Sequence, residues 1–211
     1  MSRTTQLQNP ELADVEVHGL TRASFMVRGA LAAGAVYGTS AVAPFVSQAL
    51  AAGGGGDAEI LNFALTLEYL ESAFYNEKGK TVGLSGKAKT YATDFGAQEA
   101  EHVKALTAAI KSLGGTPVAK PTFVFPVSNQ SSFLALASTL ENTGVGAYNG
   151  AAPMISSKEV LASAGSIVQI EARHAAAINL LISKSPTPNG AFDKPLTEQQ
   201  VLTAVKPLIK S

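Results

Sequence analysis

Two segments of this chain place a glutamate and a histidine three residues apart, Glu99 with His102 and Glu171 with His174. On a helix, residues three apart lie on one face, so each pair directs a carboxylate and an imidazole to the same place. Both groups are common ligands of divalent metal ions. One such pair alone indicates little, because chance often places a Glu-x-x-His on a solvent-exposed face.

The two pairs belong to an internal repeat. Upstream of each pair, a glutamate is followed by a tyrosine seven residues later, and these residues recur with the same spacing. The repeated positions are Glu68/Glu141 and Tyr75/Tyr148, which are 73 residues apart, and Glu99/Glu171 and His102/His174, which are 72 residues apart. The matched spacing predicts two copies of one helical hairpin.

The four repeated glutamates have mostly apolar neighbours three, four and seven positions away. A four-helix bundle buries such positions, and an unpaired buried carboxylate is strongly disfavoured. Two divalent cations would balance four carboxylates, and neutral imidazoles would add ligands without adding charge. We therefore predict a site for a pair of metal ions with the ligands Glu68, Glu99, His102, Glu141, Glu171 and His174. The alternative is that these residues lie on the surface or form ordinary ion pairs.

Other polar residues accompany the predicted ligands. Tyr75 and Tyr148 are candidate catalytic residues, as hydrogen-bond partners of the ligands or as electron donors; the alternative is that they fill the core. Glu71 is not repeated, since position 144 is a glycine, and Glu101 is not repeated, since position 173 is an arginine. We therefore interpret Glu71 and Glu101 as residues that either support the ligands or are solvated.

Apolar periodicity, with glycines and prolines as boundaries, predicts the elements that must position these residues. Asp57 is the expected N-cap of the first helix, and Thr197 begins a short last helix with a capping box. Three prolines exclude a helix from residues 116–129, a connection long enough to cross the end of a bundle. The long helices are expected over residues 57–78, 85–113, 129–151 and 156–183.

These elements predict an all-α fold, with an up-down four-helix bundle over residues 57–183. A long crossover joins its second and third helices, and a loop and short helix follow over residues 184–211. The formal net charge is zero, and no basic patch indicates binding to nucleic acid. The chain has no cysteine, which excludes thiolate metal sites, iron–sulfur clusters and a thiol nucleophile.

Residues 1–52 have the composition of an export leader, followed by a glycine linker over residues 53–56. A positive start, an uncharged Ala- and Gly-rich stretch and an Ala-x-Ala end within residues 49–52 are typical of a signal peptide. The start resembles a twin-arginine signal, although Ala23 replaces the second arginine. We expect export to the periplasm or cell envelope; the alternatives are an uncleaved membrane anchor and a cytosolic arm. His18 has no partner at ligand spacing and is expected to be solvated.

The segment Asn62–Glu71, which reads NFALTLEYLE, resembles bacterial ferritin-like domain proteins related to desiccation-related plant proteins, and so does Pro195–Thr197. The resemblance to the ferritin-like superfamily covers residues 57–183 and all six predicted ligands. It implies two iron ions, or manganese. It also implies that the two halves each serve one metal, with Glu99 or Glu171 bridging; the two sets are Glu68, Glu99 and His102, and Glu141, Glu171 and His174.

Three functions remain in competition at this point. The first is an oxidoreductase that oxidises ferrous iron or consumes peroxide, with peroxide or dioxygen as the small-molecule partner. The second is a non-catalytic envelope protein of the stress or desiccation response, whose metal is structural or sequestered. The third is a surface assembly module, for which the Phe123–Phe125 loop is the candidate contact unless it covers the core. Homo-oligomerisation is left open.

Overall fold

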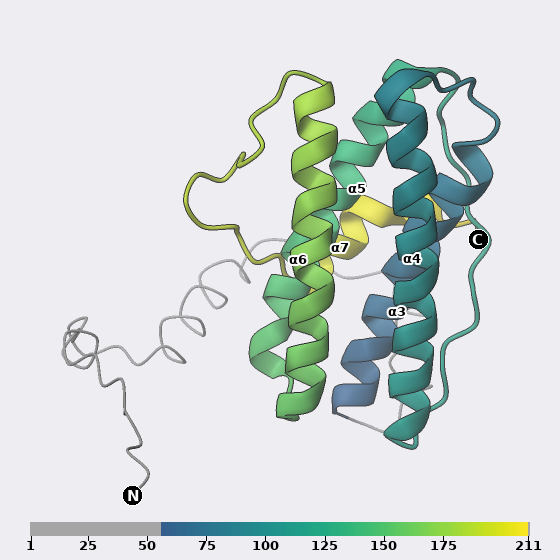
Figure 1. Cartoon of the computed structure of the whole chain (residues 1–211). Coiled ribbons are helices and arrows are strands. Elements are labelled where there is room, and N and C mark those ends of the chain that lie inside the picture. Colours follow the sequence, from purple (N-terminus) through teal and green to yellow (C-terminus); the bar gives the residue numbers. More distant parts are fainter. Residues whose placement is uncertain (1–55, 211) are drawn as a thin grey trace, which may run out of the picture. The chain divides into compact units, whose positions relative to one another are not determined.

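The computed structural model describes residues 56–210, which form the predicted helical bundle (Figure 1). The elements are α3 (Asp57–Ala73), the π-helical turn η2 (Phe74–Lys78), α4 (Gly86–Ser112), α5 (Gln130–Ala151), the 3-10 turn η3 (Ala152–Met154), α6 (Lys158–Leu181), α7 (Glu198–Val205) and the 3-10 turn η4 (Lys206–Leu208). Within these residues no helix has the length and hydropathy of a membrane span. The predicted leader and His18 lie outside the described residues.

The four long helices pack as two hairpins. α3 pairs with α4, α5 pairs with α6, and the hairpins meet where α3 contacts α5 and α4 contacts α6. Two apolar clusters fill the bundle. One contains Leu61, Leu65 and Ile110, and the other contains Phe74 and Phe133. On α4 and α6 the predicted ligands come between these clusters, so they form a polar layer inside an apolar core.

The predicted helix boundaries lie within about two residues of the observed ones at most ends, with one correction at the start of α3. Gly56 is the N-cap, and Asp57 is already helical. The Asp57 carboxylate instead accepts hydrogen bonds from the backbone N–H groups of Ser156 and Ser157, both at 2.7 Å. The predicted N-cap was therefore wrong, because this side chain connects the start of α3 to the start of α6.

The first helix does not stay α-helical to its end. Its last five residues form η2, in which the Gly79 N–H bonds the carbonyl oxygen of Phe74, five residues back, at 3.0 Å. The turn packs closely on α4, because the Asn76 side-chain amide donates to the Gly96 carbonyl oxygen at 2.6 Å. A β-carbon at Gly96 would lie 3.1 Å from the β-carbon of Tyr75. Gly96 thus lets the π-turn bring Tyr75 into the bundle.

The crossover between α4 and α5 runs along the side of the bundle, not across its end as expected (Figure 1). Phe123 and Phe125 pack against the core, and Val124 is 52% exposed. The Val124 N–H donates to the carbonyl oxygen of Leu208 at 2.8 Å. The two aromatic rings of this loop therefore cover the core, and they are not free surface contacts.

The C-terminal tail is part of the same core. The Leu196 N–H donates to the Gly146 carbonyl oxygen at 2.8 Å, and any side chain at Gly150 would collide with the Leu196 carbonyl group. The predicted capping box forms between Thr197 and Gln200. The buried side chains of the tail are Val201, Leu202, Val205 and Leu208.

Candidate metal centre

The structure brings together all six predicted ligands at the middle of the bundle. The four glutamates are fully buried, His174 is 2% exposed and His102 is 9% exposed. Each long helix contributes at least one of them, because α3 and α5 each supply one glutamate, whereas α4 and α6 each supply a Glu-x-x-His pair.

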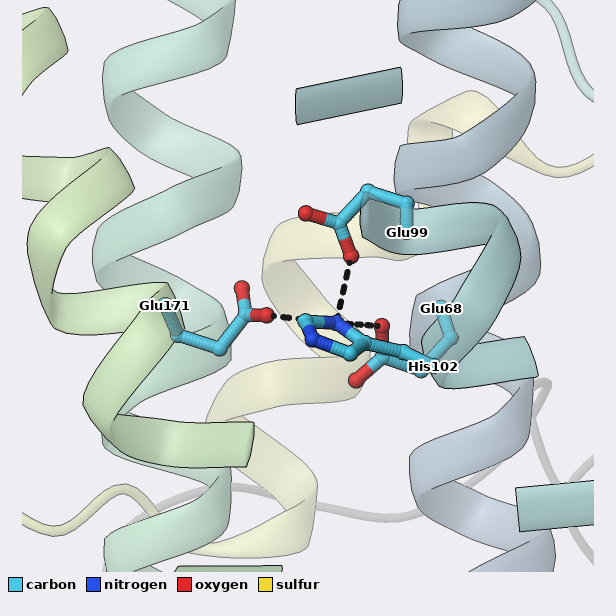
Figure 2. A group of neighbouring side chains, drawn as sticks. All are labelled: Glu68, Glu99, His102 and Glu171. Carbon is cyan, nitrogen blue, oxygen red and sulfur yellow. Dashed lines mark hydrogen bonds and ion pairs between the residues drawn. The ribbon is translucent and has the colours of Figure 1, made fainter. Parts of the chain in front are cut away.

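The ligand atoms form two groups, and within each group they lie within 4.8 Å of one another. The first group is Glu68, Glu99, His102 and Glu171, shown in Figure 2. The second group is Glu99, Glu141, Glu171 and His174. Glu99 and Glu171 belong to both groups, so the two groups share two carboxylates.

The imidazole of His102 lies among three carboxylates (Figure 2). Its Nδ1 atom is 3.2 Å from Glu68 Oε2, 3.1 Å from Glu99 Oε2 and 3.1 Å from Glu171 Oε1. A ring nitrogen carries at most one hydrogen, so it cannot satisfy three acceptors at once. A cation between these atoms would satisfy all four.

Around His174, several polar atoms are buried without a hydrogen-bond partner. His174 Nδ1 is 2.9 Å from Glu99 Oε1 and 3.5 Å from Glu141 Oε2, yet none of these three atoms has hydrogen-bond geometry. Both carboxylate oxygens of Glu171 are in the same condition. Buried polar atoms without a hydrogen-bond partner are rare in proteins, and here they lie together around His174 and Glu171. A metal ion fits this donor set.

Comparison with known families agrees with this geometry. A family model described as a ferritin-like domain matches residues 56–184, which is more than half of the chain. The chain belongs to this ferritin-like family. No curated protein matches it.

Two residues of α4 that were not predicted from sequence hold His174 of this ferritin-like protein. Gln98 Oε1 lies 2.6 Å from His174 Nε2. The amide oxygen accepts, so Nε2 carries the hydrogen and Nδ1 is left to face the carboxylates. The Phe95 ring stacks on the imidazole with the centroids 3.9 Å apart. The repeat could not reveal either residue, because both corresponding positions, 167 and 170, are isoleucines.

The two tyrosines connect the halves of the ferritin-like bundle. Tyr75 OH donates to Glu141 Oε1 and Tyr148 OH donates to Glu68 Oε1, each at 2.5 Å. Each tyrosine therefore supports the glutamate of the opposite hairpin. Burial and the neighbouring carboxylates raise the pKa of both phenols well above the usual value, which keeps them protonated as donors.

The two unrepeated glutamates differ in their surroundings. Glu101 is exposed and pairs with Lys104 at 2.6 Å, so it is solvated. Glu71 is only 3% exposed, so for this residue the solvated alternative is wrong. Burial, and then the charge of Glu171, raise the pKa of Glu71 well above its usual value.

Without a metal, protons bound to the side chains of this layer offset the negative charge of its carboxylates. Burial raises the pKa of Glu68 to about 8. Burial opposes the charging of His102, but the carboxylates of Glu171, Glu68 and Glu99 outweigh it and raise its pKa to about 12. His174 follows the same pattern, with a pKa raised to about 10. Burial also acts against ionised Glu99, but the two imidazoles lower its pKa to about 2.

Proposed function

We propose that this ferritin-like protein binds two iron or manganese ions and uses them as an oxidoreductase that oxidises ferrous iron or consumes peroxide. The support is the set of buried polar atoms without hydrogen-bond partners, which converge on two groups with two shared carboxylates. Four ionised carboxylates balance two divalent ions, and an oxygen-rich set with one imidazole per ion suits iron or manganese.

The metal pair would supply the redox chemistry, and the chain's own residues would orient and enclose it. Tyr75 and Tyr148 hold one oxygen of Glu141 and one of Glu68, which leaves the second oxygen of each carboxylate for a metal. Gln98 fixes the tautomer of His174. The apolar clusters on both sides limit the access of water, which strengthens every charge interaction between them.

The absence of cysteine narrows the reactions that fit this site. The chain cannot carry a thiolate-bound iron centre to deliver electrons. In peroxide disproportionation, one peroxide is oxidised to dioxygen and another is reduced to water, so no external reductant is required. In ferrous oxidation, the ferrous ions are the substrate and supply the electrons to dioxygen or peroxide. Both reactions are compatible with a chain without an internal electron donor.

The binding proposal is tested by metal analysis of protein purified without added metal. We expect close to two ions per chain in the wild type, and loss of nearly all metal in Glu99→Ala and a large loss in His174→Ala. Glu101→Ala is the matched control on the same helix, because its side chain is exposed. If Glu99→Ala retained two ions, the site would have to lie elsewhere.

The catalytic proposal is tested on the metal-loaded protein, by following ferrous oxidation and peroxide consumption against the same concentration of free metal. Turnover no higher than that of free metal would rule out the oxidoreductase. The complete burial of all four glutamates favours the second candidate, a non-catalytic protein whose metal is structural or sequestered. That candidate requires slow metal exchange and a large loss of thermal stability on chelation, with no turnover.

We further propose that the protein acts in the periplasm or cell envelope, on the basis of the leader-like composition of residues 1–52. Expression of the full chain in a bacterial host, followed by fractionation and N-terminal sequencing, tests this. An N-terminus near Ala51 or Ala52 in the envelope fraction supports export with cleavage. Full-length protein in the membrane fraction would support the anchor, and full-length protein in the cytosol would refute export.

A further inference from the structure

A fifth buried carboxylate, that of Glu71, lies at the centre of the contact between α3 and α5. The bonds from Tyr75 to Glu141 and from Tyr148 to Glu68 show that these two helices run antiparallel across the site. Glu71 is about midway between Glu68 and Tyr75 along α3. On α5, the corresponding midway position of the repeat is Gly144.

The missing side chain of Gly144 is what makes room for this carboxylate. A β-carbon at Gly144 would lie 3.2 Å from Glu71 Oε1 and 3.4 Å from Glu171 Oε2. The carboxylates of Glu71 and Glu171 therefore border the same small space. A side chain at position 144 would have to displace the Glu71 carboxylate from this space.

The Glu71 side chain is almost completely enclosed by the described part of the chain. Glu71 is 3% exposed, and among residues 56–210 no hydrogen bond or ion pair reaches its carboxylate. Of the two neighbouring carboxylates, that of Glu171 has both oxygens fully buried without a hydrogen bond. Burial of a carboxyl group without a partner is costly. A cation beside Glu171 would satisfy both residues.

We propose that Glu71 is a seventh protein ligand of the metal pair, which reaches the metals from the α3–α5 side through the space left by Gly144. Its oxygens lie outside the two four-residue groups, so a rotation of its side chain toward Glu171 completes the contact. This inference rests on the proposed metal pair and adds a residue that the repeat does not contain.

A seventh ligand changes the charge of the site. Four ionised carboxylates match two divalent ions, whereas five match one divalent and one trivalent ion. Ionised Glu71 therefore favours the more oxidised pair, and its replacement by a neutral amide favours the reduced pair. Such an effect would not follow if Glu71 only filled space.

The test compares Glu71→Gln and Gly144→Ala with the wild type in the full chain. Manganese titration calorimetry gives the number and affinity of bound ions, and spectroelectrochemistry of the iron-loaded protein gives its reduction potential. We expect Glu71→Gln to weaken one of the two ions about tenfold or more and to raise the potential. Gly144→Ala places a methyl group against Glu71 Oε1, so we expect a smaller shift in the same direction. Glu101→Gln is the control and should match the wild type.

The outcomes separate this inference from the proposed function. If the wild type binds fewer than two ions, both fail. If it binds two ions and Glu71→Gln binds them with the same affinity and potential, only the seventh ligand fails. The thermal stability of the apoprotein is the control for a folding defect in Glu71→Gln. Removing a buried carboxyl group from this cluster should not lower that stability. A Glu71→Gln variant with a less stable apoprotein and unchanged potential would assign Glu71 a structural role and overturn the inference.

Discussion

The hairpin α3–α4 and the hairpin α5–α6 carry the same set of ligands but surround them differently. In the first hairpin Glu71 follows Glu68 by one helical turn, whereas in the second the equivalent place is Gly144. His174 has its Nε2 bonded to Gln98. His102 faces the second hairpin, where position 170 is an isoleucine that cannot accept a hydrogen bond.

The repeat preserves the residues that the proposed metal pair requires and varies those that would distinguish one metal position from the other. The shared glutamates, the histidines and the cross-bonded tyrosines recur in both halves. The neighbouring residues Glu71 and Gln98 do not recur. We therefore expect two ions of unequal affinity.

Chelation removes the interaction that both halves share, so it should have the largest effect. With free ions at about a thousand times Kd, each bound ion stabilises the folded protein by about 4 kcal/mol. Loss of both ions should therefore lower the Tm of a protein of this size by roughly 15 °C or more. Differential scanning calorimetry with and without chelator measures it. The Glu99→Ala variant is the control and should respond little. Equal Tm values for the wild type in both conditions would contradict the shared site.

The pH dependence should have opposite signs with and without metal. The raised pKa values of Glu68 and His174, about 8 and about 10, mean that the folded apoprotein binds protons more tightly than the unfolded chain. Apoprotein stability is therefore highest at low pH and falls as pH rises from about 4.5 to about 10. Glu99, with its lowered pKa, acts oppositely but only below about pH 4.5.

Metal binding must displace the protons on Glu68, His102 and His174, so affinity should rise with pH over the same range. Each displaced proton contributes about 1.4 kcal/mol per pH unit, so the two histidine protons alone give roughly 5 kcal/mol between pH 6 and pH 8. Calorimetry in buffers of different ionisation enthalpy counts the released protons. Binding without proton release would show that the apo site does not hold them.

Removing one tyrosine hydroxyl from either half should have equal effects. Tyr75→Phe frees one oxygen of Glu141, and Tyr148→Phe frees one of Glu68, so each should destabilise the protein by about 1–3 kcal/mol in chemical denaturation. Tyr91→Phe is the matched control, because its ring stacks on Phe95 and its hydroxyl makes no hydrogen bond within residues 56–210. Unequal losses would show that the tyrosine bridges are not equivalent.

The smallest effect should come from the support of one histidine. Gln98→Leu should weaken only the ion bound by Glu141 and His174, by about tenfold, as measured by titration calorimetry. Ile170→Gln is the mirrored variant and should strengthen the other ion if the new amide reaches His102. Equal weakening of both ions by Gln98→Leu would indicate a general disturbance of the fold, not a local one.

Much of the fold and the convergence of the six candidate residues could be predicted from sequence, because both depend on periodicity. Apolar spacing set the helix ranges, and the 72- and 73-residue repeat singled out the glutamates and histidines. The same reliance on repetition explains the misses. Glu71 was not assigned to the buried cluster because its equivalent is Gly144, and Gln98 was missed because its equivalent is an isoleucine.

Other features depend on tertiary contacts that no local pattern contains. Asp57 is a residue type typical of an N-cap, yet its carboxylate accepts hydrogen bonds from the backbone of Ser156 and Ser157, about 100 residues away. The π-helical turn at Phe74–Lys78 depends on the close approach of Asn76 to Gly96. The course of the crossover depends on its pairing with Leu208. Each of these required the folded chain to be seen.

The tail bears on how the protein should be handled at the bench. The ferritin-like match ends at residue 184, and a fragment trimmed there would look like a natural unit. Such a fragment would lack Leu196, which seats against Gly146 and Gly150, and Val201, which is completely enclosed. A shortened protein would expose the apolar surface that these residues cover, and we expect it to aggregate, so expression should use the chain through Lys210.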